Sequence, residues 1–211
     1  EFATLSQQKA SAAIEKGKFS DEITPITIKT RKEEKVFDTD EFVRPSTNLE
    51  SLAKLRPAFK KDGTVTAGNA SGINDGAACV ILMSEKRANE LGFNILGFID
   101  GYATVGLDNE VMGLGPIPTT RKVLNKLNLT TDDIDLFELN EAFAAQSIAV
   151  LKELELDTTK VNINGGAIAL GHPIGASGCR ILVTLIHELI NENKIVDYAL
   201  FVSVEVKVLP L

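Results

Sequence analysis

The most informative fifteen residues of this 211-residue chain read Asn164-Gly-Gly-Ala-Ile-Ala-Leu-Gly-His172-Pro-Ile-Gly-Ala-Ser-Gly178. They contain five of its sixteen glycines and one of its two histidines. Glycine lets the backbone approach another segment or a ligand where a Cβ atom would clash. A histidine held between Gly171 and Pro173 has little backbone freedom. An isolated Gly-His-Pro is usually a tight strand-to-helix turn, whereas so long a string of this kind predicts a functional loop.

Composition and charge exclude several functional classes. The chain has 29 acidic and 22 basic residues, a net charge of −7, and no block of basic residues. This argues against a surface that follows a nucleic-acid backbone. No run of 18 apolar residues is present, so no membrane association is expected. The two cysteines, Cys79 and Cys179, lack metal-ligand spacing, so we expect no metal site, no disulfide scaffold and a reducing, cytoplasmic compartment.

The first 72 residues alternate between short elements and polar loops. A helix is expected over residues 2–16, from an apolar stripe at helical spacing: Phe2, Leu5, Ala10, Ala13 and Ile14. Alternation after Pro25 predicts a short strand at 26–28, which pairs with a second at 36–37. A further helix is expected to begin at Ser46, Thr47 or Asn48 and to end before Pro57. Because the chain opens without Met, inside a helix, we expect a fragment of a longer protein.

From residue 80 onward, strand and helix patterns alternate, which is typical of a layered α/β domain with a mixed or largely parallel sheet. Apolar runs at 80–83 and 95–105 predict two buried strands. Further strands are expected at residues 136–139, 161–163 and 198–202. Helices are expected at residues 84–91 and 119–128, from the segment 140–146 to about 154, and after Gly178.

Asn140 and His172 each follow a predicted strand, and sites in layered sheets lie in the loops at strand ends. If both loops lie at one end of the sheet, these two side chains face one pocket. A histidine there acts as a base or as an oxyanion donor, and an asparagine amide holds a water or a carbonyl. Cys79 and Cys179 are expected to be core thiols, with a reactive Cys179 at a helix start as the weaker alternative. The residues therefore predict half of an active site, without a convincing nucleophile.

Three motifs, in order, resemble the thiolase family, and within it the biosynthetic acetyl-CoA acetyltransferases. The first is Gly68-Asn-Ala-Ser-Gly-Ile-Asn-Asp-Gly-Ala77, the second is Asn140-Glu-Ala-Phe-Ala144, and the third is the stretch 164–178. The agreement extends from the first helix to about residue 199. The resemblance implies a thiolase-like layered α/β fold, in which helices flank a mixed sheet, with part of an α+β loop domain.

The resemblance also implies an activity, the acetyl transfer between CoA thioesters by Claisen condensation or thiolysis. It implies that His172 activates a nucleophilic cysteine and contributes to an oxyanion hole, and that Asn140 holds a water in that hole. The expected CoA contacts are Arg44 and Ser51 for the nucleotide end, Ser71 for the pantetheine arm, and Ala67 and Phe143 for the channel wall. The expected ligands are acetyl-CoA and acetoacetyl-CoA as substrates, without a separate cofactor.

One departure from the family is that the match begins about halfway along a typical thiolase. The half that carries the nucleophilic cysteine is not in this sequence. We expect residues 1–72 to be the C-terminal part of the CoA-binding loop domain and 73–95 the end of the N-terminal core domain. Residues 96–211 would then be the C-terminal core domain.

The other departure lies at the end of the chain, where the family has a Cys-x-Gly-Gly-Gly-x-Gly turn. Here the sequence reads Val202-Ser-Val-Glu-Val-Lys-Val-Leu-Pro-Leu211. Codons compatible with residues 201–210, read from the third base, encode Cys-Val-Gly-Gly-Gly-Gln-Gly-Ile-Ala. We therefore infer a one-base frameshift just upstream.

Sequencing the coding DNA tests the frameshift. We expect the neighbouring frame to encode Cys-x-Gly-Gly-Gly from the position of Val202 onward. A tail that cannot encode this motif in either neighbouring frame would contradict the inference.

Three functions remain open for a chain that lacks both catalytic cysteines of the family. The first is a truncated acetyl-CoA acetyltransferase that is inactive alone. The second is a non-catalytic remnant that binds CoA or a partner, and the third is one half of a split thiolase. Thiolases are homo-oligomers, and this chain is expected to self-associate through the face that the missing domain leaves uncovered.

Overall fold

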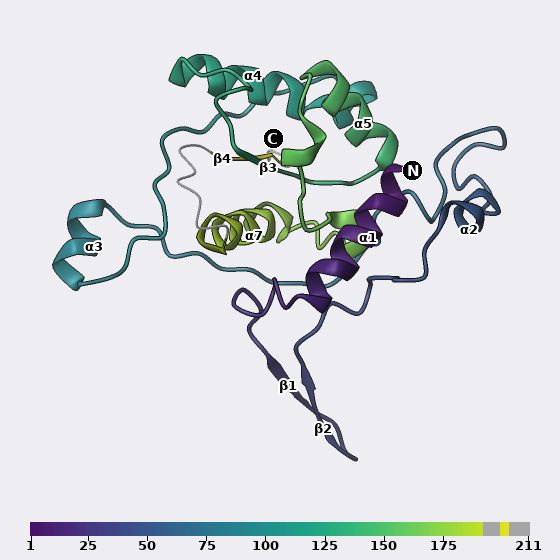
Figure 1. Ribbon diagram of the computed structural model, residues 1–211, viewed down its shortest axis with the longest axis horizontal. Helices are drawn as coiled ribbons and strands as arrows, with labels where there is room; N and C mark the ends of the chain where they lie inside the picture. The colour runs from purple at the N-terminus through teal and green to yellow at the C-terminus, as the bar shows by residue number, and fades with distance from the viewer. Residues whose placement is uncertain (192–198, 203–211) are drawn as a thin grey trace, which may run out of the picture.

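The computed structural model describes residues 1–191 and 199–202. Strands β3 (Leu136–Leu139) and β4 (Ala199–Val202) run parallel, with Leu136 opposite Ala199 and Leu139 opposite Val202. Helices α4 (Pro116–Leu127) and α5 (Ala144–Glu153) lie on one side of this pair, and α7 (Ser177–Asn191) lies on the other (Figure 1). This layering confirms the predicted α/β class.

The main core lies between β3 and the helices α4 and α5. Phe137 is 2% exposed and Val150 is 1% exposed, so the strand and α5 exclude water from their contact. The cluster consists of Ile117, Leu124, Ile134, Phe137, Leu139, Val150, Leu151, Leu154, Leu156 and Val161. Burial of such side chains contributes roughly 1.5–3 kcal/mol each, so this cluster is the main source of stability for the layers that carry the site.

Helix α1 (Phe2–Glu15) packs on the short helix α6 (Ala167–Leu170) through small residues. At Gly165, φ is +83°, and an added Cβ would lie 2.6 Å from the carbonyl oxygen of Ser6. The predicted apolar stripe is wrong at Leu5, which is 48% exposed, whereas Ala10 is fully buried. Helix α1 packs closely against the backbone at Gly165, so only small side chains fit on the face of the helix that is buried there.

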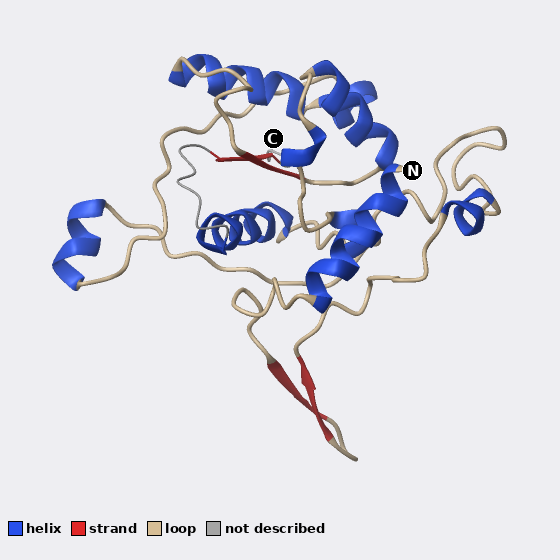
Figure 2. Cartoon of the chain, in the orientation of Figure 1, coloured by secondary structure: helices blue, strands red, loops and turns tan. Residues whose placement is uncertain are grey.

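Two predicted elements form, and they project from the layers (Figures 1 and 2). Strands β1 (Ile26–Lys29) and β2 (Glu34–Phe37) form an antiparallel hairpin. Helix α2 (Leu49–Ala53) begins after Asn48, whose side chain accepts a hydrogen bond from the N–H of Ser51. The serine hydroxyl lies 3.2 Å from the N–H of Asn48 and completes a capping box.

Helix α3 (Glu85–Leu91) confirms the predicted caps, because Ser84 caps its start and Gly92 ends it with φ at +68°. The flanking strands predicted at 80–83 and 95–105 are wrong, since neither segment forms a strand. Their side chains are exposed, with Ile81 at 79% and Phe98 at 66%. Within the described residues no strand lies alongside them, and an apolar run needs such a neighbour to become a buried strand.

Two smaller predictions also change. Residues 158–160 form a short 3-10 turn, η2 (Thr158–Lys160), and only Val161 makes a single bridge to Phe137 in place of a strand at 161–163. Cys79 lies in the uncovered segment and is exposed, so it is not a core thiol. The predicted strand at 198–202 is confirmed for 199–202, and Tyr198 and the tail from Ser203 lie outside the described residues.

Candidate functional site

The three motifs singled out in the sequence meet in space. The N–H of Ser71 donates to the carbonyl of Ala142 at 3.0 Å, and the N–H of Ala144 donates to that of Asn69 at 2.9 Å, which joins the first motif to the second. Residue 73 forms a bridge with His172, which joins the first motif to the third. The three motifs therefore lie next to one another in the fold.

Gly171 is required where the first and third motifs touch. Its φ is +102°, and an added Cβ would lie 2.6 Å from Oδ1 of Asn74. The same oxygen accepts the backbone N–H of His172 at 3.2 Å. The Asn74 side chain thus occupies the space that the glycine leaves open, and it holds the histidine backbone in place.

His172 and Asn140 face each other, although only Asn140 follows a strand, because the strand predicted at 161–163 does not form. Nδ2 of Asn140 lies 3.3 Å from Nε2 of His172. Asn140 is 5% exposed and His172 is half-buried. In the described part of the chain, the buried Oδ1 atom of Asn140 has no hydrogen-bond partner. A buried polar atom of this kind normally has a partner, so a hydroxyl or water donor fits beside this amide.

Two contributing residues were not assigned a role from sequence. Ser177, the first residue of α7, lies with Oγ 2.6 Å from Nδ1 of His172. Asn162 bonds to both the N–H and the carbonyl of Leu139, at 2.8 and 2.9 Å, in the manner of a neighbouring strand. Asn162 has a φ of +42°, a conformation that asparagine adopts more readily than most residues. This sign of a special position is visible in the structure but not in the sequence.

The buried carboxylate of Glu141 forms hydrogen bonds with the segments next to both site loops. It accepts from the hydroxyl of Ser6 at 2.6 Å, from Nδ2 of Asn162 at 2.8 Å and from the N–H of Ile168 at 3.3 Å. An added Cβ at Gly166 would lie 2.3 Å from the carboxyl carbon of Glu141. Burial raises the pKa of Glu141, and these hydrogen bonds oppose the rise.

A second buried carboxyl, Glu138, lies on β3 at 2% exposure. Burial raises its pKa to about 8, and Arg180, whose Nη1 is 3.8 Å from Oε2, lowers it only in part. The same guanidinium faces Glu22, whose pKa burial raises to about 7 despite a hydrogen bond from Thr184. One arginine at these distances does not offset the desolvation of several carboxylates.

Two of the residues predicted to contact CoA, Ser71 and Phe143, lie where the first and second motifs join. Ser71 donates its hydroxyl to the carbonyl of Ala142 at 3.1 Å. Phe143 is 37% exposed, and its ring meets that of Phe59 edge-on at a centroid distance of 6.2 Å. Both lie beside the Asn140–His172 pair, so the structure brings this part of the prediction together.

The remaining predicted contacts lie further out, where the polypeptide is exposed. The side chain of Ser51 takes part in the cap of α2. This helix packs against the segment that contains Ala67, as shown by Leu52, which fills the space beside Gly68. Arg44 is exposed, and its backbone N–H donates to Oε1 of Gln7 at 2.8 Å. Nε2 of Gln7 in turn donates to the carbonyl of Ile168, so the arginine segment is connected to the site loop.

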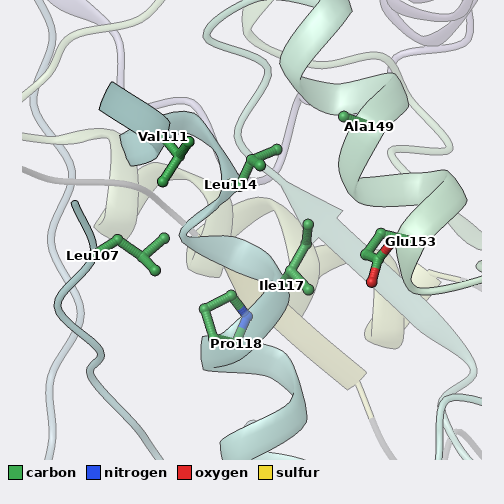
Figure 3. A pocket seen from close by; sticks show the side chains of 7 residues that line it. All are labelled: Leu107, Val111, Leu114, Ile117, Pro118, Ala149 and Glu153. Carbon is green, nitrogen blue, oxygen red and sulfur yellow. The ribbon is translucent and has the colours of Figure 1, made fainter. Parts of the chain in front are cut away.

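The surface of the described residues has two hollows. One, of about 410 Å³, borders the loop after His172 and is lined by residues 74–78, 173–176 and Cys179, which is half-buried. The other, of about 330 Å³, lies among η1 (Asn109–Leu114), α4 and α5 (Figure 3). Its one charged lining residue, Glu153, already pairs with Arg121 at 2.9 Å. Neither hollow is lined by any of the seven predicted site residues.

Residues 1–191 and 199–202 contain neither a membrane-spanning helix nor a metal-binding cluster. No helix in this part of the chain is long and apolar enough to cross a membrane. No group of three or more His, Cys, Asp or Glu side chains is arranged there to hold a metal ion.

Comparison with known proteins gives two family matches. The model of the thiolase C-terminal domain matches residues 93–202, and that of the thiolase N-terminal domain matches residues 1–86. The acetyl-CoA acetyltransferases of Chromobacterium violaceum and Pseudomonas aeruginosa are each 60% identical, over 89% and 91% of this chain. These alignments cover 48% and 49% of the relatives, so the chain spans about half their length.

Solved structures agree with the sequence matches. The acetyl-CoA acetyltransferase of Bacillus anthracis superposes with a TM-score of 0.89 at 55% identity, over 91% of this chain and 49% of that one. Human mitochondrial 3-ketoacyl-CoA thiolase in complex with CoA gives a TM-score of 0.83 at 48% identity, over 90% and 47%.

The buried carboxyls predict a pH dependence of stability. In the unfolded chain Glu138 loses its proton near its ordinary pKa of 4.5, whereas in the folded chain it keeps the proton to about pH 8. The folded state therefore binds more protons between these values. We expect the free energy of unfolding to fall with rising pH across this range, by about 1.4 kcal/mol per pH unit for each such proton.

Urea unfolding at several pH values between 5 and 8 measures this slope. Glu138→Gln, which stays neutral, should flatten it, whereas Glu50→Gln, which removes an exposed carboxyl on α2, should leave it unchanged. A slope that is the same in the Glu138 variant and in the parent chain would contradict the assignment.

Proposed function

Because the chain belongs to the thiolase family, we propose that it supplies the histidine–asparagine half of an acetyl-CoA C-acetyltransferase site. One observation carries the proposal. Asn140 and His172 come from separate loops and meet at 3.3 Å, with the free acceptor Oδ1 of Asn140 buried beside them. Relatives that are 60% identical carry the name acetyl-CoA acetyltransferase. The site thus suits a reaction in which a thioester carbonyl gains negative charge.

The chemistry follows from these two side chains. His172 accepts the proton of a nucleophilic thiol, and its ring then stabilises the charge that develops on the thioester oxygen. Asn140 orients a water that donates to the same oxygen. Preorganised donors at a developing oxyanion stabilise the transition state by roughly 3 kcal/mol each. The thiol that attacks the thioester is not among the residues of this chain, so we propose that the chain has no turnover alone.

The proposed substrates are acetyl-CoA and acetoacetyl-CoA, and no separate cofactor takes part. A solved relative is in complex with CoA. Ser71 and Phe143 lie next to the reacting pair and suit the pantetheine arm, with Ala67 at the channel wall. Ser51 and the exposed cation Arg44 lie further out, where the charged nucleotide end of CoA remains in water. The free cysteines suit a cytoplasmic compartment.

We also propose the predicted domain division. Residues 1–72 would belong to the CoA-binding loop domain, 73–95 to the end of the N-terminal core domain, and 96–211 to the C-terminal core domain. The two family matches meet between residues 86 and 93, which supports a boundary near residue 95. The protruding hairpin and α2 suit a loop domain that contacts a long ligand.

A second candidate, one half of a split thiolase, is favoured by the extended segments 74–83 and 93–108. Their apolar side chains are exposed, with Leu82 at 69% and Tyr102 at 79%. An uncovered apolar surface of this kind marks a protein contact or an aggregation site. The proposed partner is a polypeptide equivalent to the first half of the relatives, and self-association is the competing outcome.

The chain by itself should bind substrate without turning it over. We expect CoA binding without thiolysis of acetoacetyl-CoA, because the attacking thiol is absent. Titration calorimetry with CoA should show that Arg44→Ala weakens binding several-fold, whereas Lys86→Ala on α3 does not. Thiolysis by the purified chain that is lost in His172→Ala would contradict the proposed inactivity. Equal CoA affinity in the Arg44 variant would contradict the proposed contact.

Mixed with the first half of the Chromobacterium violaceum relative, the chain should form a one-to-one complex in size-exclusion chromatography with light scattering. The substitutions Leu82→Asp and Phe98→Asp should prevent it, whereas Ile26→Asp on the hairpin, where Ile26 is 61% exposed against 69% for Leu82 and 66% for Phe98, should not. If the complex still forms with both the Leu82 and the Phe98 variants, the split-enzyme candidate is contradicted. It is also contradicted if the chain associates only with itself.

A further inference from the structure

Both ring nitrogens of His172 have a defined neighbour. Nδ1 lies 2.6 Å from Oγ of Ser177, and Nε2 lies 3.3 Å from Nδ2 of Asn140. A neutral imidazole has one donor and one acceptor nitrogen, and the hydrogen bond at one nitrogen decides which of them faces the other side. The two neighbours together therefore determine which ring nitrogen of His172 carries the proton.

The asparagine side of the ring requires an acceptor. An amide nitrogen only donates, so Nε2 must present its lone pair to Asn140. The opposite tautomer would require the amide of Asn140 to turn around, which would leave its buried nitrogen in place of its oxygen without a partner. An orphaned donor is the rarer arrangement in proteins, so the proton belongs on Nδ1.

The serine side is consistent with this placement. If Nδ1 carries the proton, Oγ of Ser177 must accept it, and the hydroxyl hydrogen must go elsewhere. The carbonyl of Pro173 lies 3.1 Å from Oγ, and a carbonyl only accepts. That carbonyl also accepts the N–H groups of Ala176 and Ser177, so the hydroxyl makes a third, longer contact. Every proton then points one way, from Asn140 through His172 and Ser177 to Pro173.

We propose that Ser177 is a positioning residue, which holds His172 in the Nδ1–H tautomer and directs the Nε2 lone pair toward Asn140. The tautomer stands on this geometry alone, and its consequence for catalysis rests on the proposed function. Nε2 is then the nitrogen that takes up a proton from the attacking thiol. Ser177 is 1% exposed, so water does not compete for its hydroxyl.

The test reads the tautomer directly and needs no activity. In the ¹⁵N-labelled chain at a pH where histidine is neutral, long-range proton–nitrogen NMR spectra distinguish a protonated from an unprotonated ring nitrogen. His187→Gln removes the other histidine of the chain and assigns the signals. We expect Nδ1 of His172 to be protonated and Nε2 to be unprotonated.

Three serine variants complete the test. Ser177→Ala should shift the ratio of tautomers several-fold toward Nε2–H, and Ser177→Thr, which keeps the hydroxyl, should restore the parent ratio. Ser147→Ala is the matched control, because Ser147 makes the same bond at the start of α5, to the carbonyl of Phe143 at 3.0 Å, away from the histidine ring. It should leave the ratio unchanged.

The outcomes that overturn the proposal are separate from those for the proposed function. Nε2 protonated in the parent chain, or a folded Ser177→Ala variant with an unchanged ratio, would refute the positioning role. If Ser177→Ala does not fold, the parent and Ser177→Thr spectra decide, since a threonine variant with the Nε2–H form would refute it as well. CoA binding is measured independently, so either hypothesis can fail while the other holds.

Discussion

The hydrogen bonds to the buried carboxyl group of Glu141 hold together segments that lie more than a hundred residues apart. They come from Ser6 on α1, from Asn162 beside β3 and from the backbone of Ile168 on α6. Removing one partner from a buried carboxyl leaves an unsatisfied group that costs several kcal/mol. The site loops on either side of this group therefore keep their positions only while α1, β3 and α6 remain assembled. Gly166 is part of the same constraint, because any side chain there would collide with the carboxyl.

This arrangement explains why polar groups are concentrated beneath the histidine. Asn162 ends the strand by bonding to both backbone groups of Leu139, so the next residue, Asn140, leaves the sheet and turns toward His172. Glu138 is buried on the strand and shares one arginine with other carboxyls. A core of this kind is less stable than an apolar one of the same volume. The large apolar cluster around Phe137 offsets the free-energy cost of burying these polar groups. The buried polar groups can therefore serve to orient the site loops.

The exposed segments show how differently helices and strands depend on their surroundings. Helix α3 forms although it is almost fully exposed, because its hydrogen bonds and both caps lie within ten residues. The flanking apolar runs at 80–83 and 95–105 remain extended, because a strand needs hydrogen-bond partners from another segment. Only part of the second run is held in place, where Lys122 donates to the carbonyl of Thr104 and Lys126 lies over the ring of Tyr102. The same local pattern therefore yields a strand in one setting and an uncovered segment in another.

Local information in the sequence was sufficient for the caps of α3, for the hairpin, and for the placement of Asn140 after a strand end and of His172 in a glycine-rich loop. It narrowed the start of α2 to three residues, of which Asn48 is the cap. These features depend on neighbours within a few residues, and the long glycine motifs were specific enough to indicate the thiolase family. Tertiary structure decided the rest. Leu5 became exposed and Ala10 buried because α1 meets a glycine backbone, and His172 met Asn140, 32 residues away in the chain, because two separate loops converge. Those outcomes depend on which segments meet in space, and a single sequence does not encode such contacts in any local pattern.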